Sequence, residues 1–486
     1  MADEELAPGT TPVLKKGFTF GSALALAFAD ISPIVALYTV FALGLFAVGP
    51  AFFWALPVVL LGQLLVAVCF GEMASRYPFA GSVYQWARHI QGSGAGWFAG
   101  WAYMWGLTAA LATCTVAGAG FFFELIGVEA STTEVAAGAI VIVIAGSICN
   151  MVGRSVLRTM VGLSIVAEII GSVGLSIILL TKYRVNPFST LFDGIGSSGP
   201  EALWQGGAML TAVAFVGYSF LGFEAAGSIA EEVKDPAREV PKAMFYSLLG
   251  VGVVVILSCF ALLLAVPDIH QVVADGSADP LALTLHFHMG DGFARAFLAL
   301  IVIGFASSFL AVQAAVSRCI WGTARDRGLV GNAWLVKLRG AERLPVNAIL
   351  LTTIVAIVLI LLSGSELYRV LVNFTSIGFY ISFGIPVWCL AIARWKGVWV
   401  PGPFTTGRWG GLIASIAAAW VLFQSINIAW PRDIVGQPWY IDWSMLLTTV
   451  ILGAVGAVIY ARVAPQMDRP VGERLADEHT RGEASA

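Results

Sequence analysis

An acidic residue lies in the middle of the first long apolar stretch of the chain, beside residues that interrupt helices. The stretch Leu24–Gly44, LALAFADISPIVALYTVFALG, carries Asp30, Ser32 and Pro33 near its centre. Proline lacks a backbone N–H and clashes with the preceding helical turn, so we expect unwinding over residues 29–34. A carboxylate inside a membrane helix costs about 2.5 to 3.5 kcal/mol even on the gentler insertion scale, which makes Asp30 a candidate for function. It could hold a substrate amine, bind a cation or carry a proton.

A second apolar stretch carries the same kind of interruption. In TAVAFVGYSFLGFEAAGSIAEE, Gly217 and Gly222 flank a short segment that is followed by Glu224. Ser32 and Gly217 lie equally far from the starts of their predicted spans, near residues 19 and 204. Matching interruptions in successive five-helix units indicate an inverted-repeat transporter with its site near the membrane midplane. Proline kinks and glycines also serve helix packing alone, and this alternative stays open.

The composition indicates a membrane protein. Of the 486 residues, 58% are hydrophobic and 12% are charged, which lies outside the range of ordinary soluble domains. About 20 apolar residues cross the hydrocarbon core, and such a run must be helical because lipid cannot bond its backbone. We predict an all-α integral membrane protein with twelve transmembrane helices, at residues 19–46, 50–72, 96–123, 134–153, 156–181, 204–230, 243–266, 292–317, 346–363, 367–393, 410–430 and 442–463.

The basic residues predict the orientation. With both termini in the cytoplasm, most of the 27 Lys and Arg residues fall in cytoplasmic segments, as the positive-inside rule requires. We therefore expect a multi-pass protein of the cell (plasma) membrane, with a transmembrane domain at 18–464 and cytoplasmic tails at 1–17 and 465–486. The first apolar run is too long for a signal peptide and lacks a cleavage site, so we expect it to stay in place.

Several classes of function find no support. The six cysteines lie in or at the ends of apolar runs without a CxxC pair or a His/Cys cluster, so we expect neither a disulfide nor a metal site. The motifs GxxxxGK[ST], HExxH and GxSxG are absent, which disfavours direct use of ATP and a membrane enzyme such as an acyltransferase. No basic patch with interleaved aromatic residues suggests a nucleic-acid partner. We expect no cofactor and no enzymatic activity.

Four motifs carry a family resemblance. GEMASRYPFAGSVYQWAR (Gly71–Arg88) resembles the segment that joins the second and third helices of the amino acid/polyamine/organocation permeases. GFEAAGSIAEEVKDPAREVPKA (Gly222–Ala243) is similar to the end of their sixth helix and the loop after it. SRCIWGTARDRGLV (Ser317–Val330) resembles the loop after the eighth helix, and RLPVNAILL resembles the ninth helix. With DISP in place of a glycine-rich GSG in the first helix, the chain is nearest the branch that includes GABA and choline permeases.

This resemblance implies the leucine-transporter fold. Helices 1–5 and 6–10 would form inverted repeats, here at 18–181 and 204–393, and two extra helices would follow at 410–464. It also implies alternating access around helices 1 and 6, with transport of amino acids or related small amines such as GABA, polyamines or choline.

The family's substrate site falls on the two interrupted stretches. The first matches the unwound segment that binds the substrate carboxylate, and Tyr218 matches an aromatic residue that caps the substrate in some members. Glu224 could bind the amino group or move a proton, or it could bridge packed helices. The expected substrate-binding residues are Asp30, Ile31, Ser32, Pro33, Ile34, Gly217, Tyr218, Gly222 and Glu224.

The coupling site departs from the family pattern. In several proton-coupled members a lysine of helix 5 takes the place of a sodium ion, but the matching residue here is Glu168. A carboxylate cannot mimic a cation, so Glu168 would coordinate a cation, cycle a proton or pair with another group; simple hydrogen bonding at a helix interface is the alternative. We expect Asp30 and Glu168, with Ser307 or Ser308 of the eighth helix, to surround the coupling ion, H⁺ or Na⁺.

Two further groups of charges lie at predicted cytoplasmic ends. Glu72 and Arg76 are spaced i and i+4 and are expected to pair, either as part of a cytoplasmic gate or for structure alone. Arg325, Asp326 and Arg327 are expected to form a solvated cytoplasmic face.

The sequence thus predicts a secondary active transporter, a symporter that imports an amino acid or small amine by alternating access. Its expected partners are the substrate, the coupling ion and membrane lipid, and it would act as a monomer or homodimer. Two alternatives remain. The chain could be an exchanger that swaps a precursor for its decarboxylated product, or a sensor that binds substrate without transporting it.

Overall fold

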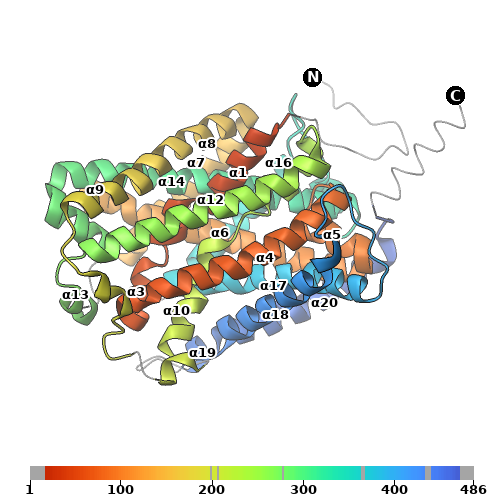
Figure 1. Ribbon diagram of the computed structural model, residues 1–486. Coiled ribbons are helices and arrows are strands. Elements are labelled where there is room, and N and C mark those ends of the chain that lie inside the picture. The colour runs from red at the N-terminus through yellow and green to blue at the C-terminus, as the bar shows by residue number, and fades with distance from the viewer. Residues whose placement is uncertain are drawn as a thin grey trace, which may run out of the picture.

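The computed structural model describes residues 17–197, 200–204, 207–275, 279–362, 367–432 and 439–470. Within these ranges every regular secondary-structure element is a helix, and the only strand-like pairings are two isolated β-bridges. The long helices lie alongside one another in one bundle (Figure 1). Ten stretches of the described residues are long and apolar enough to cross a membrane. This agrees with the all-α membrane protein that the sequence predicts.

Within the described residues, each predicted span overlaps a helix or consecutive helices. The helices are α1 (Phe20–Ile31), α2 (Pro33–Tyr38), α3 (Phe41–Val48), α4 (Ala55–Arg76), α5 (Val83–Gln91), α6 (Ser93–Ile126), α7 (Thr132–Val152), α8 (Arg154–Glu168), α9 (Leu175–Lys182), α10 (Ala208–Val216), α11 (Ala225–Ser228), α12 (Pro236–Ala265), α13 (Ile269–Asp275), α14 (Pro280–Arg325), α15 (Asn332–Leu335), α16 (Val346–Leu362), α17 (Leu367–Trp395), α18 (Gly410–Ala429), α19 (Trp439–Asp442) and α20 (Ser444–Val463).

The first apolar segment is interrupted at a single residue. Helix α1 ends at Ile31 and α2 begins at Pro33, with Ser32 between them at φ 50° and ψ 114°. The prediction that residues 29–34 unwind is therefore wrong in its extent. Proline is favourable at the first position of a helix, where an N–H would have no intrahelical partner. Pro33 thus begins a new helix after the interruption.

The sixth segment has a longer interruption, which begins at Gly217 as predicted. After α10, a 3₁₀ turn covers Gly217–Phe220 and Leu221 is extended, before α11 begins at Ala225. Gly222 has a φ of 101°, a conformation that glycine adopts readily and other residues rarely do.

The two interruptions lie together inside the bundle. Helix α1 packs against α11, α12 and α14, and α2 packs against the Gly217–Phe220 turn. Helix α6 packs along both α14 and α17, which complete the surroundings of the interruptions. Segments far apart in the sequence therefore enclose one central region.

The two described ends of the chain lie at the same end of the bundle. Phe18 forms a β-bridge with Val233, and the Asp468 N–H donates to the Asp326 carbonyl at 3.1 Å. We call this the termini end. Helices α3, α13 and α19 lie toward the opposite end (Figure 1).

Candidate functional site

A cavity lies where the two interruptions meet. We call it the central cavity. The broken segments and helices α6, α14 and α17 form its walls. Its lining residues are Asp30, Ile31, Val35, Ala110, Cys114, Tyr218, Leu221, Gly222, Val312, Thr375 and Phe379.

Among the residues that the structure describes, Asp30 is the only acidic one that lines the central cavity. It is 5% exposed, and neither carboxylate oxygen has a hydrogen-bond partner among the described residues. Its backbone carbonyl accepts a hydrogen bond from Ser308 Oγ at 3.2 Å. An uncompensated buried charge costs several kcal/mol. The Asp30 side chain therefore requires a bound proton or a cationic group.

Gly222 lies directly against this carboxylate. A Cβ atom at Gly222 would lie 3.2 Å from Asp30 Cγ and closer still to Oδ2. Together with its positive φ, this contact explains why glycine occupies the position. The sixth segment can approach Asp30 only because this residue has no side chain.

Glu168 contacts the first interruption from α8. Its Oε2 accepts the Ile34 N–H at 2.9 Å, and its Oε1 accepts a hydrogen bond from Ser32 Oγ. The side chain is buried, and a π-helical segment, Ile169–Gly174, follows it directly. Such segments occur frequently at functional sites. Of the roles left open by the sequence, the structure shows hydrogen bonding, with Glu168 as a cap of α2.

Glu224 lies outside the central cavity. Its Oε1 accepts a hydrogen bond from Tyr103 of α6 at 2.8 Å, and its backbone carbonyl accepts one from Ser82 at 3.4 Å. These contacts fit the alternative in which Glu224 bridges packed helices.

The remaining residues predicted for the site divide into two groups. Ile31 and Tyr218 line the central cavity with Asp30 and Gly222, whereas Ser32, Pro33, Ile34 and Gly217 do not. The Ile34 side chain instead packs where Gly171 and Gly304 lie, and the Gly217 carbonyl accepts a bond from Tyr380 at 3.3 Å. Ser308 reaches the backbone of Asp30, while the buried Ser307 hydroxyl has no partner among the described residues.

Sequence reasoning missed the contribution of α17. Ala110 and Cys114 of α6 and Val312 of α14 line the cavity. Thr375 and Phe379 of α17 also line the cavity. They lie in an apolar helix without a charge or break to mark the side that faces the centre.

The comparison with protein families identifies the chain. The model of the amino acid permease family matches residues 18–455. The chain belongs to this family. An uncharacterized amino-acid permease of Schizosaccharomyces pombe is 25% identical over 233 residues, which are 46% of this chain and 41% of that protein. The match thus spans about two fifths of that relative.

The matches to two further relatives cover a larger share of both chains. The amino-acid permease BAT1 of Arabidopsis thaliana is 23% identical over 86% of each chain. The low-affinity putrescine importer PlaP of Escherichia coli is 25% identical over 310 residues, which are 62% of this chain and 65% of that one.

The permease does not pair Glu72 with Arg76 as predicted. Glu72 is buried and forms an ion pair of 2.5 Å with Arg394 of α17, and it also accepts the Thr406 N–H at 2.6 Å. Arg76 lies at the exposed end of α4, where its guanidinium contacts the Tyr77 ring. The i, i+4 spacing allowed the pair, but Glu72 faces the interior and Arg76 faces outward.

A network of buried ion pairs lies at the termini end of the bundle. We call it the termini-end network. Its pairs are Arg88–Asp326 at 2.5 Å, Arg318–Glu232 at 3.2 Å and Arg325–Glu231 at 2.9 Å.

The prediction of a solvated face at Arg325–Arg327 is therefore wrong for two of the three residues. Arg325 and Asp326 are buried in ion pairs, and the Arg327 side chain is 63% exposed. The sequence shows a run of charges, but it does not show that oppositely charged partners come from α5 and from the turn after α11.

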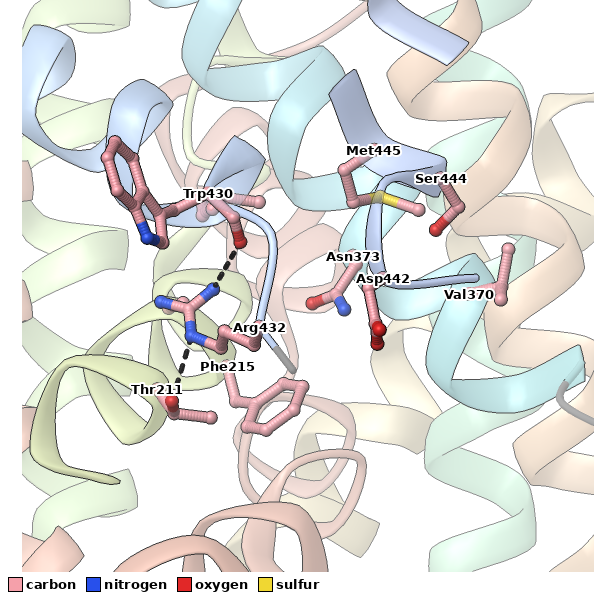
Figure 2. A pocket seen from close by; sticks show the side chains of 11 residues that line it. Thr211, Phe215, Val370, Asn373, Trp430, Arg432, Asp442, Ser444 and Met445 are labelled. Carbon is pink, nitrogen blue, oxygen red and sulfur yellow. Dashed lines mark hydrogen bonds between the residues drawn. The ribbon is translucent and has the colours of Figure 1, made fainter. Parts of the chain in front are cut away.

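A second pocket lies where α10, α17, α18 and α20 meet (Figure 2). Arg432 forms one side, where its Nε donates to Thr211 Oγ1 at 2.8 Å and its Nη1 to the Trp430 carbonyl at 3.3 Å. Asn373 and Asp442 lie on the side away from this guanidinium group (Figure 2). The pocket shares α17 with the central cavity but contains neither interruption.

Proposed function

We propose that this permease is a secondary active transporter that binds its substrate in the central cavity. Asp30 is the observation that carries the proposal: within the described part of the chain its buried carboxylate has no hydrogen-bond partner, and it lies between two interrupted helices. Acidic residues at membrane depth mark substrate and ion pathways. The substrate would be an amino acid or small amine whose ammonium group binds Asp30. The relatives named as an amino-acid permease and a putrescine importer support this class.

The proposal includes the leucine-transporter fold. Twelve spanning helices would contain inverted repeats at 18–181 and 204–393, with extra helices at 410–464. The interruptions at Ser32 and Gly217 support this arrangement because they occur at matching places and meet at one cavity. The distribution of Lys and Arg supports cytoplasmic termini in the plasma membrane.

Alternating access would operate through the termini end. From the central cavity, the sixth segment continues from Gly222 to Glu231 and Glu232, which belong to the termini-end network. These ion pairs hold the turn after α11 against α14, so they would have to separate before substrate could leave on that side.

Coupling to a proton or sodium gradient would use Asp30, Ser307 and Ser308. Ser308 bonds the Asp30 carbonyl, and the Ser307 hydroxyl is buried without a partner among the described residues. A proton on Asp30, or a cation between these oxygens, would remove the uncompensated charge from the cavity.

Uptake into proteoliposomes tests the function. The purified permease would receive labelled amino acids, GABA and putrescine under an inward proton or sodium gradient. We expect accumulation that an ionophore abolishes, and the gradient required identifies the coupling ion. Uptake that needs only substrate preloaded inside would instead establish exchange. Binding without any uptake would contradict transport and favour the sensor.

A further inference from the structure

Helix α10, which leads into the interruption of the sixth segment, is fastened near its start to the end of α18. Asn427 Nδ2 of α18 donates to the Leu210 carbonyl at 2.9 Å. Arg432, which follows α18, donates from Nε to Thr211 Oγ1 at 2.8 Å and from Nη2 to Asn427 Oδ1 at 2.8 Å. Helix α10 also packs against α17 and α18 (Figure 1). The start of α10 is therefore tied to helices that come much later in the chain.

The end of α10, where the interruption begins, is held in the same way. Gln424 Nε2 of α18 donates to the Val213 carbonyl at 3.3 Å, and the Tyr380 hydroxyl of α17 donates to the Gly217 carbonyl at 3.3 Å. The last carbonyls of a helix lose their regular partners at an interruption, and lipid supplies no donors. Donors from α17 and α18 therefore stabilise an interruption at this place.

Gly217 allows these two side chains to reach the backbone. A Cβ atom at this residue would lie 3.2 Å from Gln424 Nε2 and 3.2 Å from Tyr380 Cε2. The backbone of Gly217 is helical, with a φ of −50°, so its conformation does not require glycine. The close approach of α17 and α18 explains the glycine instead.

The two sides of the interruption are anchored to different helices. Beyond it, Tyr103 of α6 donates to Glu224 at 2.8 Å, and α14 pairs with Glu231. Before it, α10 is bound to α17 and α18. Tyr218 lies between these two anchored parts and lines the central cavity. The position of Tyr218 therefore depends on the bonds that hold Gly217, its neighbour in the chain.

We propose that Gln424 and Tyr380 are positioning residues for the central cavity. They act through the backbone of the sixth segment, because neither belongs to the described lining of the cavity. Helix α18, which lies outside the proposed inverted repeats, thereby determines the place of Tyr218. Where the cavity binds substrate, the proposal rests on the proposed function.

The reactivity of Cys114 tests the positioning without any substrate. Cys114 lines the cavity, and its Sγ lies 3.8 Å from the Tyr218 hydroxyl. Gln424→Met keeps the length of the side chain and removes its donor, and Tyr380→Phe removes only the hydroxyl. In the full-length, detergent-purified permease, each variant should react with N-ethylmaleimide at Cys114 roughly fivefold faster than the wild type, the population change that loss of one hydrogen bond allows. Peptide mass spectrometry measures the rate at this cysteine.

Trp388→Phe is the matched control. Trp388 Nε1 of α17 donates to the Ala418 carbonyl of α18 at 3.1 Å, so this variant weakens the same pair of helices without removing a bond to α10. Its Cys114 should react at the wild-type rate. An unchanged rate in Gln424→Met and Tyr380→Phe, or an equal increase in Trp388→Phe, would overturn the proposal. If one of the two test variants does not fold, the other decides.

Uptake of labelled putrescine and GABA separates this proposal from the proposed function. For whichever is taken up, KM should rise about fivefold in Gln424→Met and Tyr380→Phe and stay unchanged in Trp388→Phe. A wild type that takes up neither compound, nor any amino acid, contradicts transport, while the Cys114 rates still decide the positioning. Normal uptake with unchanged Cys114 rates and KM values leaves transport standing and overturns the positioning.

Discussion

The Asp30 carboxylate is buried and has no hydrogen-bond partner in the ranges that the structure describes, which is unfavourable for stability and useful for binding. Asp30→Asn removes the charge and leaves the shape of the side chain. We therefore expect a higher unfolding temperature without substrate and an affinity for amines that falls roughly 100-fold, as for loss of a buried charged partner. Thermal unfolding with and without putrescine measures both effects.

Asp326→Asn is the matched control for this substitution. Asp326 is equally buried, but it is paired with Arg88 at 2.5 Å. Removing one partner of a buried pair leaves the other charge uncompensated and costs about 3 to 5 kcal/mol. This variant should therefore unfold at a lower temperature. If both substitutions shift the unfolding temperature in the same direction, the account of Asp30 is wrong.

His89 lies outside the membrane-spanning segments and predicts that the stability of the protein depends on pH. Its ring stacks between Tyr77 and Phe79, with centroid distances of 4.8 and 5.1 Å, and its Nδ1 lies 2.8 Å from the Gln85 carbonyl. Burial lowers the pKa of His89 to about 4 from 6.5. The unfolded chain thus binds a proton below pH 6.5 while the folded protein does not. Stability should fall by about 3 kcal/mol as the pH drops from 6.5 to 4.

The substitution His89→Phe isolates this contribution. Phenylalanine keeps the aromatic stack with Tyr77 and Phe79 but cannot be protonated. Unfolding temperatures measured between pH 7 and 4.5 should decline less steeply in the variant than in the wild type. Parallel declines would show that other groups account for the acid sensitivity.

At the scale of helices, order and hydropathy along the chain could be predicted, but rotation about each helix axis could not. The spans follow from apolar length, and the interruptions follow from Pro33 and the glycines of the sixth segment. Which side of a helix faces the centre depends on packing between helices. Thr375 and Phe379 were missed for this reason, and Glu72 was paired with Arg76 instead of Arg394.

The extent of the first interruption was mistaken because proline was treated as a residue in the middle of a helix. In the structure Ser32 takes a positive φ and Pro33 begins α2. The sequence showed the break, but not that Glu168, distant in the chain, would satisfy the new helix end.

Ser32 caps the short helix α2, and we expect its substitution to lower both the stability of the protein and the affinity for substrate. Ser32 Oγ accepts the Val35 N–H and donates to Glu168, so Ser32→Ala removes both bonds. Loss of an N-cap lowers the free energy of unfolding by about 1 kcal/mol. We expect this loss together with weaker binding of amines, because α2 carries the cavity residue Val35.

Ser131→Ala serves as the comparison, measured by chemical unfolding and calorimetry. Ser131 caps the exposed start of α7, where its hydroxyl accepts the Glu134 N–H at 3.3 Å, far from the central cavity in the chain. Both variants should lose similar stability, but only Ser32→Ala should lose affinity. An equal loss of affinity in both variants would show that α2 has no specific role in substrate binding.

On the scale of the whole molecule, we propose that the termini-end network holds one side of the bundle closed. It joins α5, α14 and the turn after α11, and Phe18 and Asp468 fasten the described ends of the chain to the same region. Breaking one pair would destabilise this closed arrangement. Since a difference of about 1.4 kcal/mol changes a population tenfold, a single substitution can shift the balance toward an open state.

The substitution Arg318→Gln tests whether breaking one ion pair favours the open state. The readout is the reactivity of a native cysteine thiol. Cys114 lines the central cavity, and Arg318 pairs with the buried Glu232. In vesicles, a small impermeant methanethiosulfonate should label Cys114 from the termini face at least about tenfold faster in the variant, since losing a buried pair costs more than 1.4 kcal/mol. Bound putrescine should slow this labelling. Cys259 of α12 is buried and lies outside the cavity, so it should stay unlabelled. Faster labelling of Cys114 from the opposite face would show that the gate lies at that face.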